Sequence, residues 1–294
     1  MSVLSIQSGV AVGHVGNSAA TPALQRLGHA VWRVDTVSFS NHPAHGAFTG
    51  RVHPADEVGR VIEGIGALTG WVGCSGVLSG YLGAAGTAAE VARAVDAVKV
   101  VEPQSIYCCD PVIGDDGRVF VAEGVGEAIA AELIGRADIL TPNLFELAWL
   151  VGRDLAAGDI AAGDIAASDI VADNIPSILS AASELRQRGA GSVVVTGIEA
   201  GDRISTIVLD ADGAWQVSAR RFEHKLYGAG DLFAALLVGW RLKLGDLPSA
   251  VVRAVAGMEI IAEATSNAGG GELALLANLG HLADASRMAD IERV

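Results

Sequence analysis

The stretch Gly228-Ala229-Gly230-Asp231, followed by LFAALLVGW at residues 232–240, joins a glycine turn to an apolar helical pattern. Glycine lets the backbone turn tightly and leaves neighbouring N–H groups uncovered. At a helix N-terminus, such N–H groups and the helix dipole attract anions. Asp231 falls at or near the N-cap, where aspartate is often no more than a cap. The stretch therefore predicts either a capped helix or an anion-binding turn beside a carboxylate.

Short apolar runs alternate with helical patterns along the rest of the chain. The runs predict buried strands at Val3–Ile6, Ala30–Val34, Gly76–Ser79, Ser105–Cys109, Asp138–Leu140, Ser192–Thr196 and Thr206–Leu209. Helices are predicted at Asn17–Leu27, Ala55–Ile65, Thr87–Val101, Gly124–Ile134, Leu144–Val151, Ile175–Arg188, Asp231–Leu244, Leu247–Glu263 and Leu273–Asn278. We therefore expect an α/β fold in which a mainly parallel central sheet has helices on both faces.

No long linker interrupts this alternation, so residues 1–294 are expected to form a single domain. Residues 156–170 stand apart, because AAGDI-AAGDI-AASDI is a five-residue near-repeat. A period of five fits neither a helix nor a strand. The segment is interpreted as an insertion at the surface.

The composition indicates a soluble cytoplasmic protein. Lys and Arg total 20 and Asp and Glu total 34, which gives a net charge of −14 and argues against nucleic acid or an anionic membrane as the main partner. The 3 cysteines cannot form a disulfide framework and suit a reducing compartment. The first residues carry no basic signal region, and no run of about 18 apolar residues suggests a membrane span.

Two common nucleotide-binding patterns are absent from the sequence. None of Lys99, Lys225 and Lys243 lies in a P-loop pattern. The glycines at 9, 13 and 16 do not form the dinucleotide-binding fingerprint, and Asp35 is a weak candidate for its acidic residue. A P-loop enzyme is therefore excluded, and a nicotinamide-dependent dehydrogenase is disfavoured.

Carboxylates follow two of the predicted strands. Asp110 and Asp115 lie in CDPVIGD at residues 109–115, and Glu146 lies in TPNLFEL at residues 141–147. The carboxyl ends of parallel strands are where ligand crevices form in α/β sheets. Each residue alone is more often a cap or a solvated loop residue, but together Asp110 and Glu146 could hold Mg²⁺ directly or through water.

At these residues the chain resembles the ribokinase-like superfamily, and within it the pyridoxal kinases. The glycine turn marks only the superfamily, whereas the segments FSNH at 39–42 and SGYLG at 79–83 are typical of the vitamin B6 branch. The resemblance spans nearly the whole chain. It runs through IQS at 6–8, GHVGNSAA at 13–20, LG at 27–28, DTVSFSNH at 35–42, LSGYLG at 78–83, CDPVIG at 109–114, TPNLFEL at 141–147 and GAGDLFAA at 228–235.

The resemblance implies a role for each matched position. Asp231 would be the general base, and Gly228, Ala229 and Gly230 the anion hole. The substrate would be bound by Ser8, His42, Pro43, Ala44, Tyr81 and Asp231. ATP would be bound by Asp110, Asp115, Thr141, Asn143, Glu146, Thr196, Ala219, Arg220, Arg221 and Phe222. The resemblance also implies ATP and pyridoxal as small-molecule substrates, Mg²⁺ as cofactor together with a monovalent cation as a candidate, and a homodimer.

Departures from the family pattern leave the preferred substrate open. Pro43 stands where the family usually has a threonine whose hydroxyl contacts the substrate, and proline offers neither a hydroxyl nor an N–H. His45 is close by and could supply a polar group. Phe120 stands where many members have tyrosine near ATP.

The leading hypothesis is an ATP-dependent pyridoxal kinase that phosphorylates the 5′-hydroxyl, with pyridoxine and pyridoxamine as further candidates. A kinase for another small alcohol, such as hydroxymethylpyrimidine or a sugar, remains open because of Pro43. A non-catalytic vitamin B6-binding protein is a rival from another class, although a pure binder needs no base at Asp231. An α/β scaffold without a ligand would make the matched segments a coincidence.

Overall fold

A mixed ten-stranded sheet runs through the residues described by this computed structural model, which are 1–153, 167–284 and 288–294. Its strand order is β14-β11-β10-β9-β8-β5-β4-β1-β2-β3. The strands are β1 (Ser2–Val10), β2 (Ala30–Phe39), β3 (Gly50–Val52), β4 (Cys74–Ser79), β5 (Ile106–Cys109), β8 (Ile139–Leu140), β9 (Ser192–Ala200), β10 (Arg203–Leu209), β11 (Ala214–Arg220) and β14 (Asp290–Arg293). The strands from β9 to β2 are parallel, and antiparallel strands extend both edges. The predicted mainly parallel sheet is confirmed.

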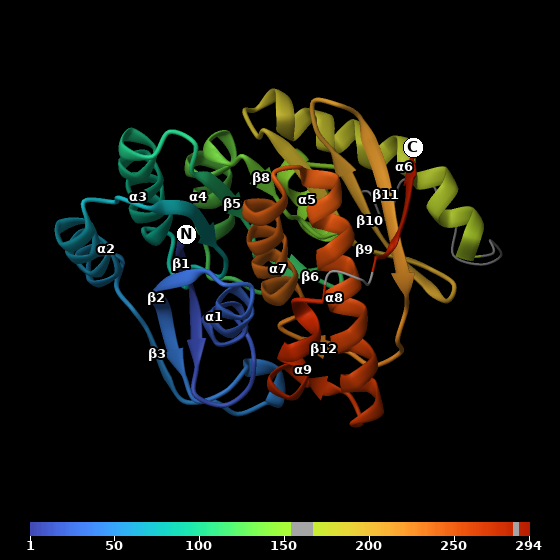
Figure 1. Cartoon of the computed structure of the whole chain (residues 1–294), viewed down its shortest axis with the longest axis horizontal. Helices are drawn as coiled ribbons and strands as arrows, with labels where there is room; N and C mark the ends of the chain where they lie inside the picture. The colour runs from blue at the N-terminus through green and yellow to red at the C-terminus, as the bar shows by residue number, and fades with distance from the viewer. Residues whose placement is uncertain (154–166, 285–287) are drawn as a thin grey trace.

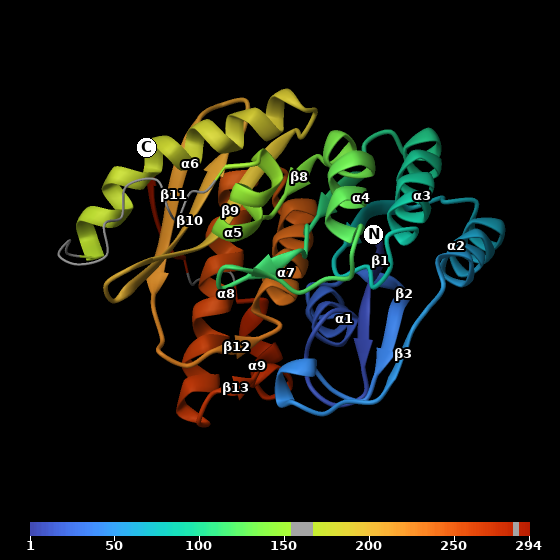
Figure 2. The same cartoon turned by 180° about the vertical axis from the view of Figure 1, so that it is seen from behind.

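Helices cover both faces of this sheet, as the two opposite views show (Figures 1 and 2). One face packs against α2 (Ala55–Thr69), α3 (Thr87–Val101), α4 (Val125–Glu132), α5 (Leu144–Val151) and α6 (Ala167–Gln187). The other packs against α1 (Asn17–Arg26), α7 (Ala229–Leu244), α8 (Leu247–Asn267) and α9 (Leu275–Leu282). Each face buries its own apolar cluster, so the two cores fix the sheet between two helical layers.

The order of the strands creates a crevice at one edge of the sheet. The chain passes from β1 outward to β2 and then crosses back to β4 on the other side of β1. Connections that leave adjacent strands in opposite directions open a crevice at the carboxyl ends of those strands. Two short strand pairs lie outside the main sheet, β6 (Gly114–Asp115) with β7 (Arg118–Val119) and β12 (Leu226–Tyr227) with β13 (Gly271–Glu272).

The helix predictions hold best where the apolar period is regular. Thr87–Val101 and Leu144–Val151 begin and end at the predicted residues. Strands β1 and β2 extend to Val10 and Phe39, several residues beyond the predicted ends. Strand β11 was not predicted, because its residues alternate in burial rather than forming one apolar run. Of the 156–170 near-repeat, residues 156–166 lie outside the described residues, and 167–170 belong to α6.

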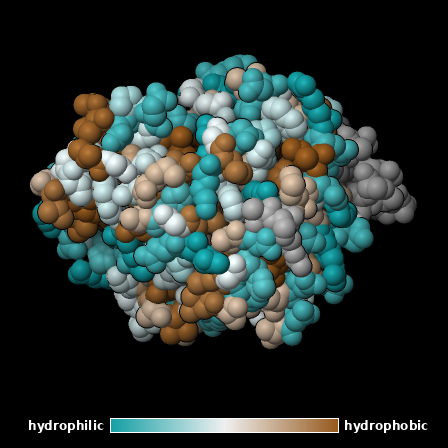
Figure 3. All heavy atoms as spheres, viewed as in Figure 1, coloured by the Kyte–Doolittle hydropathy of each residue, from teal (hydrophilic) through white to brown (hydrophobic). Residues whose placement is uncertain are grey.

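The face seen in Figure 3 mixes polar side chains with separate apolar patches. The most exposed large apolar side chains include Leu68 at the end of α2, Val72 just after it and Val100 at the end of α3. No helix among the described residues is long and apolar enough to cross a membrane.

Candidate active site

One large cavity, of about 1670 Å³, lies at the carboxyl ends of the parallel strands. Nearly all of the sequence-predicted site residues line it, although they come from segments more than two hundred residues apart. They are Ser8, His42, Pro43, Ala44, Tyr81, Asp110, Asp115, Thr141, Asn143, Glu146, Thr196, Ala219, Arg220, Gly228, Ala229, Gly230 and Asp231. The fold therefore brings the motifs of the substrate side and of the nucleotide side to one place.

Two predicted residues do not line the cavity. The Arg221 guanidinium forms an ion pair with Glu199 at 2.8 Å. The Phe222 ring lies under the guanidinium of Arg220, 4.6 Å from its carbon to the ring centre. Phe222 can therefore influence the cavity only by holding Arg220, which does line it.

The glycine turn is the N-terminus of α7, but Asp231 is not its cap. Gly228 is the N-cap, with φ of 84°, and Asp231 is the third residue of the helix. A Cβ at Gly228 would lie 2.1 Å from the carbonyl oxygen of His14, so only glycine fits there. In the described part of the chain, the N–H groups of residues 229–231 have no backbone acceptor. They are free to bind an anion from the cavity.

Among the described residues, no cationic group acts on the Asp231 carboxylate. The N–H group of Gly16 donates a hydrogen bond to it. Burial nevertheless raises the pKa of Asp231 to about 6, because loss of water disfavours the charged form more than this bond favours it. The capping interpretation is wrong, since the side chain bonds to the loop between β1 and α1 rather than to its own helix.

Asp110, directly after β5, faces the start of α7. Its Oδ1 accepts a hydrogen bond from the Thr141 hydroxyl at 2.9 Å. Its Oδ2 would be 3.8 Å from a Cβ placed on Gly230. Burial, and then the negative charge of Asp231, raise the pKa of Asp110 to about 7. Asp110 is buried and Asp231 is partly buried, and the repulsion between their charges would be relieved by a hard cation bound beside them.

Glu146 also holds the backbone at the start of α5 and in the loop after Asp110, a role that its sequence motif did not predict. Its two carboxylate oxygens accept bonds from the N–H groups of Ile113 and Asn143, both at 3.0 Å. The Asn143 side chain in turn accepts a bond from the Glu146 N–H at 2.8 Å and donates one to the Gly114 carbonyl at 2.9 Å. This capping box starts α5 and ties it to the loop after Asp110. Burial raises the pKa of Glu146 well above its ordinary value.

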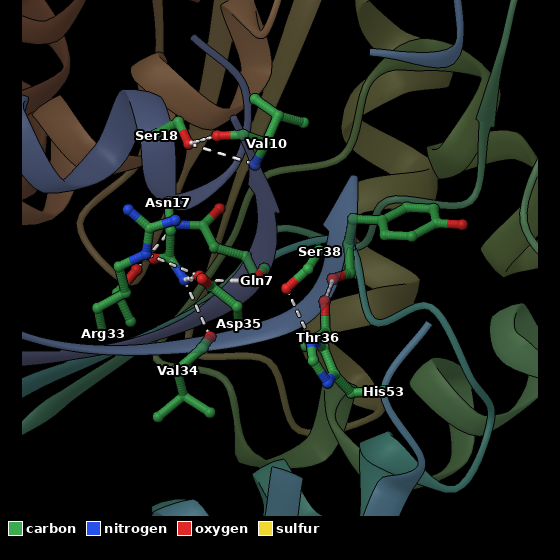
Figure 4. Close-up of polar contacts among 12 residues, drawn as sticks. Gln7, Val10, Asn17, Ser18, Arg33, Val34, Asp35, Thr36, Ser38 and His53 are labelled. Carbon is green, nitrogen blue, oxygen red and sulfur yellow. Dashed lines mark hydrogen bonds and ion pairs between the residues drawn. The ribbon is translucent and has the colours of Figure 1, made fainter. Parts of the chain in front are cut away.

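At the other end of the cavity, a polar network holds the segments that carry Ser8 and Tyr81 (Figure 4). The Thr36 hydroxyl donates to the Tyr81 carbonyl at 2.6 Å. The buried Asn17 amide donates to the Val34 carbonyl at 2.9 Å and to Asp35 Oδ1 at 2.8 Å, joining the start of α1 to β2. The network thereby fixes the loop from which Gly16 reaches Asp231. It also occupies Asp35, so that residue plays no dinucleotide-binding part.

The segment 40–49, which we call the flap, connects β2 to β3. Its residues His42, Pro43 and Ala44 line the cavity, and Pro43 begins a short 3₁₀ turn. His45 does not supply the polar group that the sequence suggested for the cavity. Its Nε2 lies 2.5 Å from an oxygen of Glu272, outside the cavity lining.

Some of the cavity wall was not predicted from the sequence. Lys225 lies three residues before Gly228 and pairs with Asp116 at 2.6 Å, and both residues line the cavity. Its rarity, one of 3 lysines, was a usable signal. The apolar wall from α8, which includes Val255 and Met258, carried no such signal, because apolar residues at helical spacing look the same in a core and in a pocket.

Known proteins similar to this chain were found both by sequence and by structure. Residues 52–275 match the model of a family described as phosphomethylpyrimidine kinase. Pyridoxal kinase PdxY of Deinococcus radiodurans is 37% identical, and the match covers 99% of this chain and 96% of that protein. Pyridoxal kinase PdxY of Rubrobacter xylanophilus is 39% identical over 94% of this chain and 92% of that protein.

The structures that resemble this fold include pyridoxal kinases. That of Leishmania donovani, in complex with ADP and pyridoxine, has a TM-score of 0.86 at 28% identity, covering 100% of this chain and 99% of that one. Pyridoxal kinase of Entamoeba histolytica, at 22% identity and a TM-score of 0.88, shares the fold over 100% of this chain and 99% of that one.

Proposed function

The chain belongs to the pyridoxal kinase family, and from that membership we propose that it transfers the γ-phosphoryl group of ATP to the 5′-hydroxyl of pyridoxal. The products are pyridoxal 5′-phosphate and ADP. The observation that carries the proposal is Asp231, an unpaired carboxylate with a pKa raised to about 6 at the N-terminus of α7, facing the cavity that Ser8 and Asp110 also line. Neither a scaffold nor a simple binding protein needs such a group.

Asp231 would act as the general base. A primary alcohol is a poor nucleophile until its proton has an acceptor, and a carboxylate with a pKa near 6 is ionised at neutral pH yet more basic than an ordinary aspartate. The 5′-hydroxyl proton passes to Asp231 as the oxygen attacks the γ-phosphorus, and the Gly16 N–H keeps the carboxylate in place.

The start of α7 would serve as the anion hole. The unbonded N–H groups of residues 229–231 lie next to Asp231 and point outward from the helix N-terminus. During transfer the phosphoryl oxygens keep a high negative charge, which fixed N–H donors stabilise without rearranging. Because Gly228 packs against the His14 carbonyl, this turn is held rigidly.

The residues at the strand ends fit a magnesium ion that arrives with the nucleotide. Among the described residues there is no group of three or more metal-ligating side chains, so the protein alone does not offer a full ligand set. Among the described residues, Asp110 Oδ2 has no hydrogen-bond donor and the carboxylate has no cationic partner, which suits a hard cation that keeps phosphate and water ligands. Mg²⁺ supplies charge neutralisation of the phosphates when bound. Glu146 contributes mainly by holding the loop after Asp110, since both its oxygens already accept N–H bonds.

The vitamin would bind at the end formed by β1, the flap and Tyr81. Ser8 offers a hydroxyl to the pyridine ring, and Tyr81, His42 and Pro43 surround it. ATP would take the other end, bordered by Thr196, Ala219 and Arg220, with Asp115, Thr141 and Asn143 near the phosphates. Of the predicted nucleotide residues, Arg221 and Phe222 would act only through Glu199 and Arg220.

A direct assay separates this proposal from its alternatives. The purified protein is incubated with ATP and Mg²⁺, and ADP release is measured with pyridoxal, pyridoxine, pyridoxamine and hydroxymethylpyrimidine in parallel. The proposal expects the highest kcat/KM with a vitamin B6 form. The name of the matched family model keeps hydroxymethylpyrimidine as the rival substrate, and faster turnover of that alcohol would replace our proposal. Binding of pyridoxal without ADP release would favour a non-catalytic protein.

Assembly, location and a second cation are also proposed from the family membership. We propose that the protein is a cytoplasmic homodimer. Its activity would require Mg²⁺ and would be stimulated by a monovalent cation. The cytoplasm is supported by the three cysteines, Cys74, Cys108 and Cys109, all of them free and buried. Sedimentation at two protein concentrations tests the dimer, and turnover in sodium against potassium salts tests the monovalent cation.

A further inference from the structure

Glu272 joins three segments that surround the substrate end of the cavity. One carboxylate oxygen lies 2.5 Å from Nε2 of His45 on the flap. The other accepts a hydrogen bond from the N–H of His14, in the loop between β1 and α1, at 3.2 Å. Glu272 itself lies on β13, in register with Tyr227 of β12. The Glu272 side chain therefore connects the flap to the loop that carries Gly16, and its backbone pairs with the strand that leads into the glycine turn.

Tyr227 provides the platform on which the flap rests. The His42 ring stacks on the Tyr227 ring, with centres 5.2 Å apart and planes at 25°. The His45 ring meets the same ring edge-on, with centres 5.4 Å apart. Among the described residues beyond position 200, Tyr227 and Glu272 make all of the hydrogen bonds, ion pairs and ring contacts with the flap.

The base of the flap is held by bonds between Ser40 and Thr49 and by the Phe39–Phe48 ring contact, whereas its tip is attached to the rest of the protein through His42 and His45. Residues 43–49 are exposed on their outer side. Pro43 can donate no hydrogen bond to the rest of the protein or to a ligand. Ala44 is thus placed by where its neighbour His45 is attached, and His42 by its own stacking on Tyr227 together with that attachment.

We infer that Glu272 is a positioning residue for the alcohol substrate, one that fixes the flap over the substrate end of the cavity through His45. The inference rests on the proposed function, since the ligand it concerns is an aromatic ring that carries a primary alcohol. Glu272 does not line the cavity, so it acts through the flap and not by touching the substrate.

The two carboxylate oxygens of Glu272 have different partners, which allows substitutions that affect one or both contacts. Each oxygen serves one donor, His45 on one side and the His14 N–H on the other. Glutamine has the same shape but only one acceptor oxygen, so if that oxygen keeps the His14 N–H, the NH₂ group can bond to His45 only when the ring changes tautomer and Nε2 accepts. Glu272→Gln is therefore expected to weaken the attachment of the flap, and Glu272→Ala to release both segments.

The experiment compares Glu272→Gln, Glu272→Ala, His45→Ala and the Glu272→Ala/His45→Ala double variant with the parent protein. Asp56→Asn is the matched control, because Asp56 forms an exposed ion pair with Arg60 at 2.7 Å on α2 and has no contact with the cavity. KM is measured separately for pyridoxal and for ATP. Hydrogen exchange of peptides covering residues 40–50 is followed by mass spectrometry without ligands.

In the Glu272 and His45 variants, we expect the KM for pyridoxal to rise by about tenfold, which corresponds to the loss of one hydrogen bond to a charged group. The KM for ATP should change by less than about twofold in the same variants. The effects of Glu272→Ala and His45→Ala should be less than additive in the double variant, because both changes break the His45–Glu272 contact, while His45→Ala also removes the edge contact with Tyr227. Exchange in residues 40–50 should accelerate in these variants and stay unchanged in Asp56→Asn.

Unchanged exchange of the flap in Glu272→Ala would overturn the inference, as would an equal rise of both KM values with a lower melting temperature. Faster exchange with an unchanged KM for pyridoxal would overturn the positioning role as well. Should the parent protein phosphorylate no vitamin B6 form, the proposed function fails separately. In that case, hydrogen exchange of the flap and the dissociation constant of pyridoxal, compared between the parent and the Glu272 variants, show whether Glu272 positions the flap.

Discussion

In the proposed reaction, Asp231 is the side chain that accepts the proton of the substrate hydroxyl. Its pKa of about 6 results from burial, opposed by a single N–H bond from Gly16. Asp231→Asn keeps the shape and can still accept that bond, but it cannot accept a proton. We expect kcat with pyridoxal to fall by about 10²–10⁴-fold, the usual effect of losing a general base. Steady-state kinetics at saturating ATP measure it.

The same variant should not lose stability. A carboxylate with a raised pKa opposes folding when ionised, so its removal leaves the melting temperature at pH 8 equal or higher. A kcat within about threefold of the parent would contradict the role of Asp231 as base. A large fall in melting temperature would mean that the variant misfolds, and Asp231→Ser, which also lacks the base, would then replace it.

The raised pKa of Asp110 should make the folding stability of the protein depend on pH. This pKa is about 7 in the folded protein, against 3.8 ordinarily. Between these values the folded state holds the proton more tightly, so its contribution to stability is lost as pH rises from about 4 to about 7. Asp110→Asn, whose amide oxygen can still accept the Thr141 bond, should therefore stabilise the metal-free protein above pH 7 and not at pH 4.

The size of this gain should be at least that of one pKa unit, about 1.4 kcal/mol, or roughly 2–4 °C in melting temperature. Thermal unfolding of parent and variant in EDTA across pH 4–8 measures the difference. A difference that does not grow with pH would contradict the raised pKa. Thr141→Val is a useful companion, because removing a bond to the charged form should raise the pKa of Asp110 further.

At the scale of elements, helix α7 permits a closely matched comparison of its two ends. Gly228 begins the helix with φ of 84°, and Gly245 ends it with φ of 86°. A Cβ at Gly228 would lie 2.1 Å from the His14 carbonyl, whereas one at Gly245 has no heavy atom within 4 Å. Gly228→Ala should therefore lower kcat/KM for ATP by more than about tenfold, since the anion-binding turn must move.

Gly245→Ala carries the same backbone strain, about 1–2 kcal/mol, without the clash. It should lower the melting temperature and leave kcat/KM near that of the parent. Equal kinetic effects of the two substitutions would contradict the idea that the turn itself binds the transferring group.

At the scale of the whole molecule, metal and nucleotide should bind together. The described residues contain no three-ligand cluster, and Asp110 faces a cavity open to the phosphates. Mg²⁺ alone should therefore shift the melting temperature by less than about 1 °C. Mg²⁺ with a non-hydrolysable ATP analogue at about 100 times its dissociation constant should raise it by about 5 °C or more.

Thermal-shift measurements with Mg²⁺, the analogue, and both together check this expectation, with EDTA as the control. Turnover should stop in excess EDTA and return when Mg²⁺ is added. Strong stabilisation by Mg²⁺ alone would indicate a metal site made by the protein itself, and full turnover in EDTA would remove the metal from the proposal.

The sequence by itself determined the fold class and predicted most of the polar residues that the structure places around one cavity. Apolar runs of strand length separated by helical patterns require a layered α/β structure, because each element must bury its apolar side against another. Helices such as Thr87–Val101 were located to the residue, since their period of apolar positions is regular. Glycine turns and carboxylates at strand ends are local signals, so Gly228, Asp110 and Asp231 were found without the structure.

Only the tertiary structure decided which groups each of those residues contacts. Asp231 is the third residue of α7 and not its cap, because the helix begins at Ala229 with Gly228 as N-cap, and its carboxylate is influenced by Gly16, more than two hundred residues away in the chain. Glu146 proved to be tied to two backbone N–H groups, and Glu272 had no local signal that linked it to His45. Contacts of this kind and the raised pKa values depend on which distant segments exclude water from a group, and a linear pattern does not contain that information.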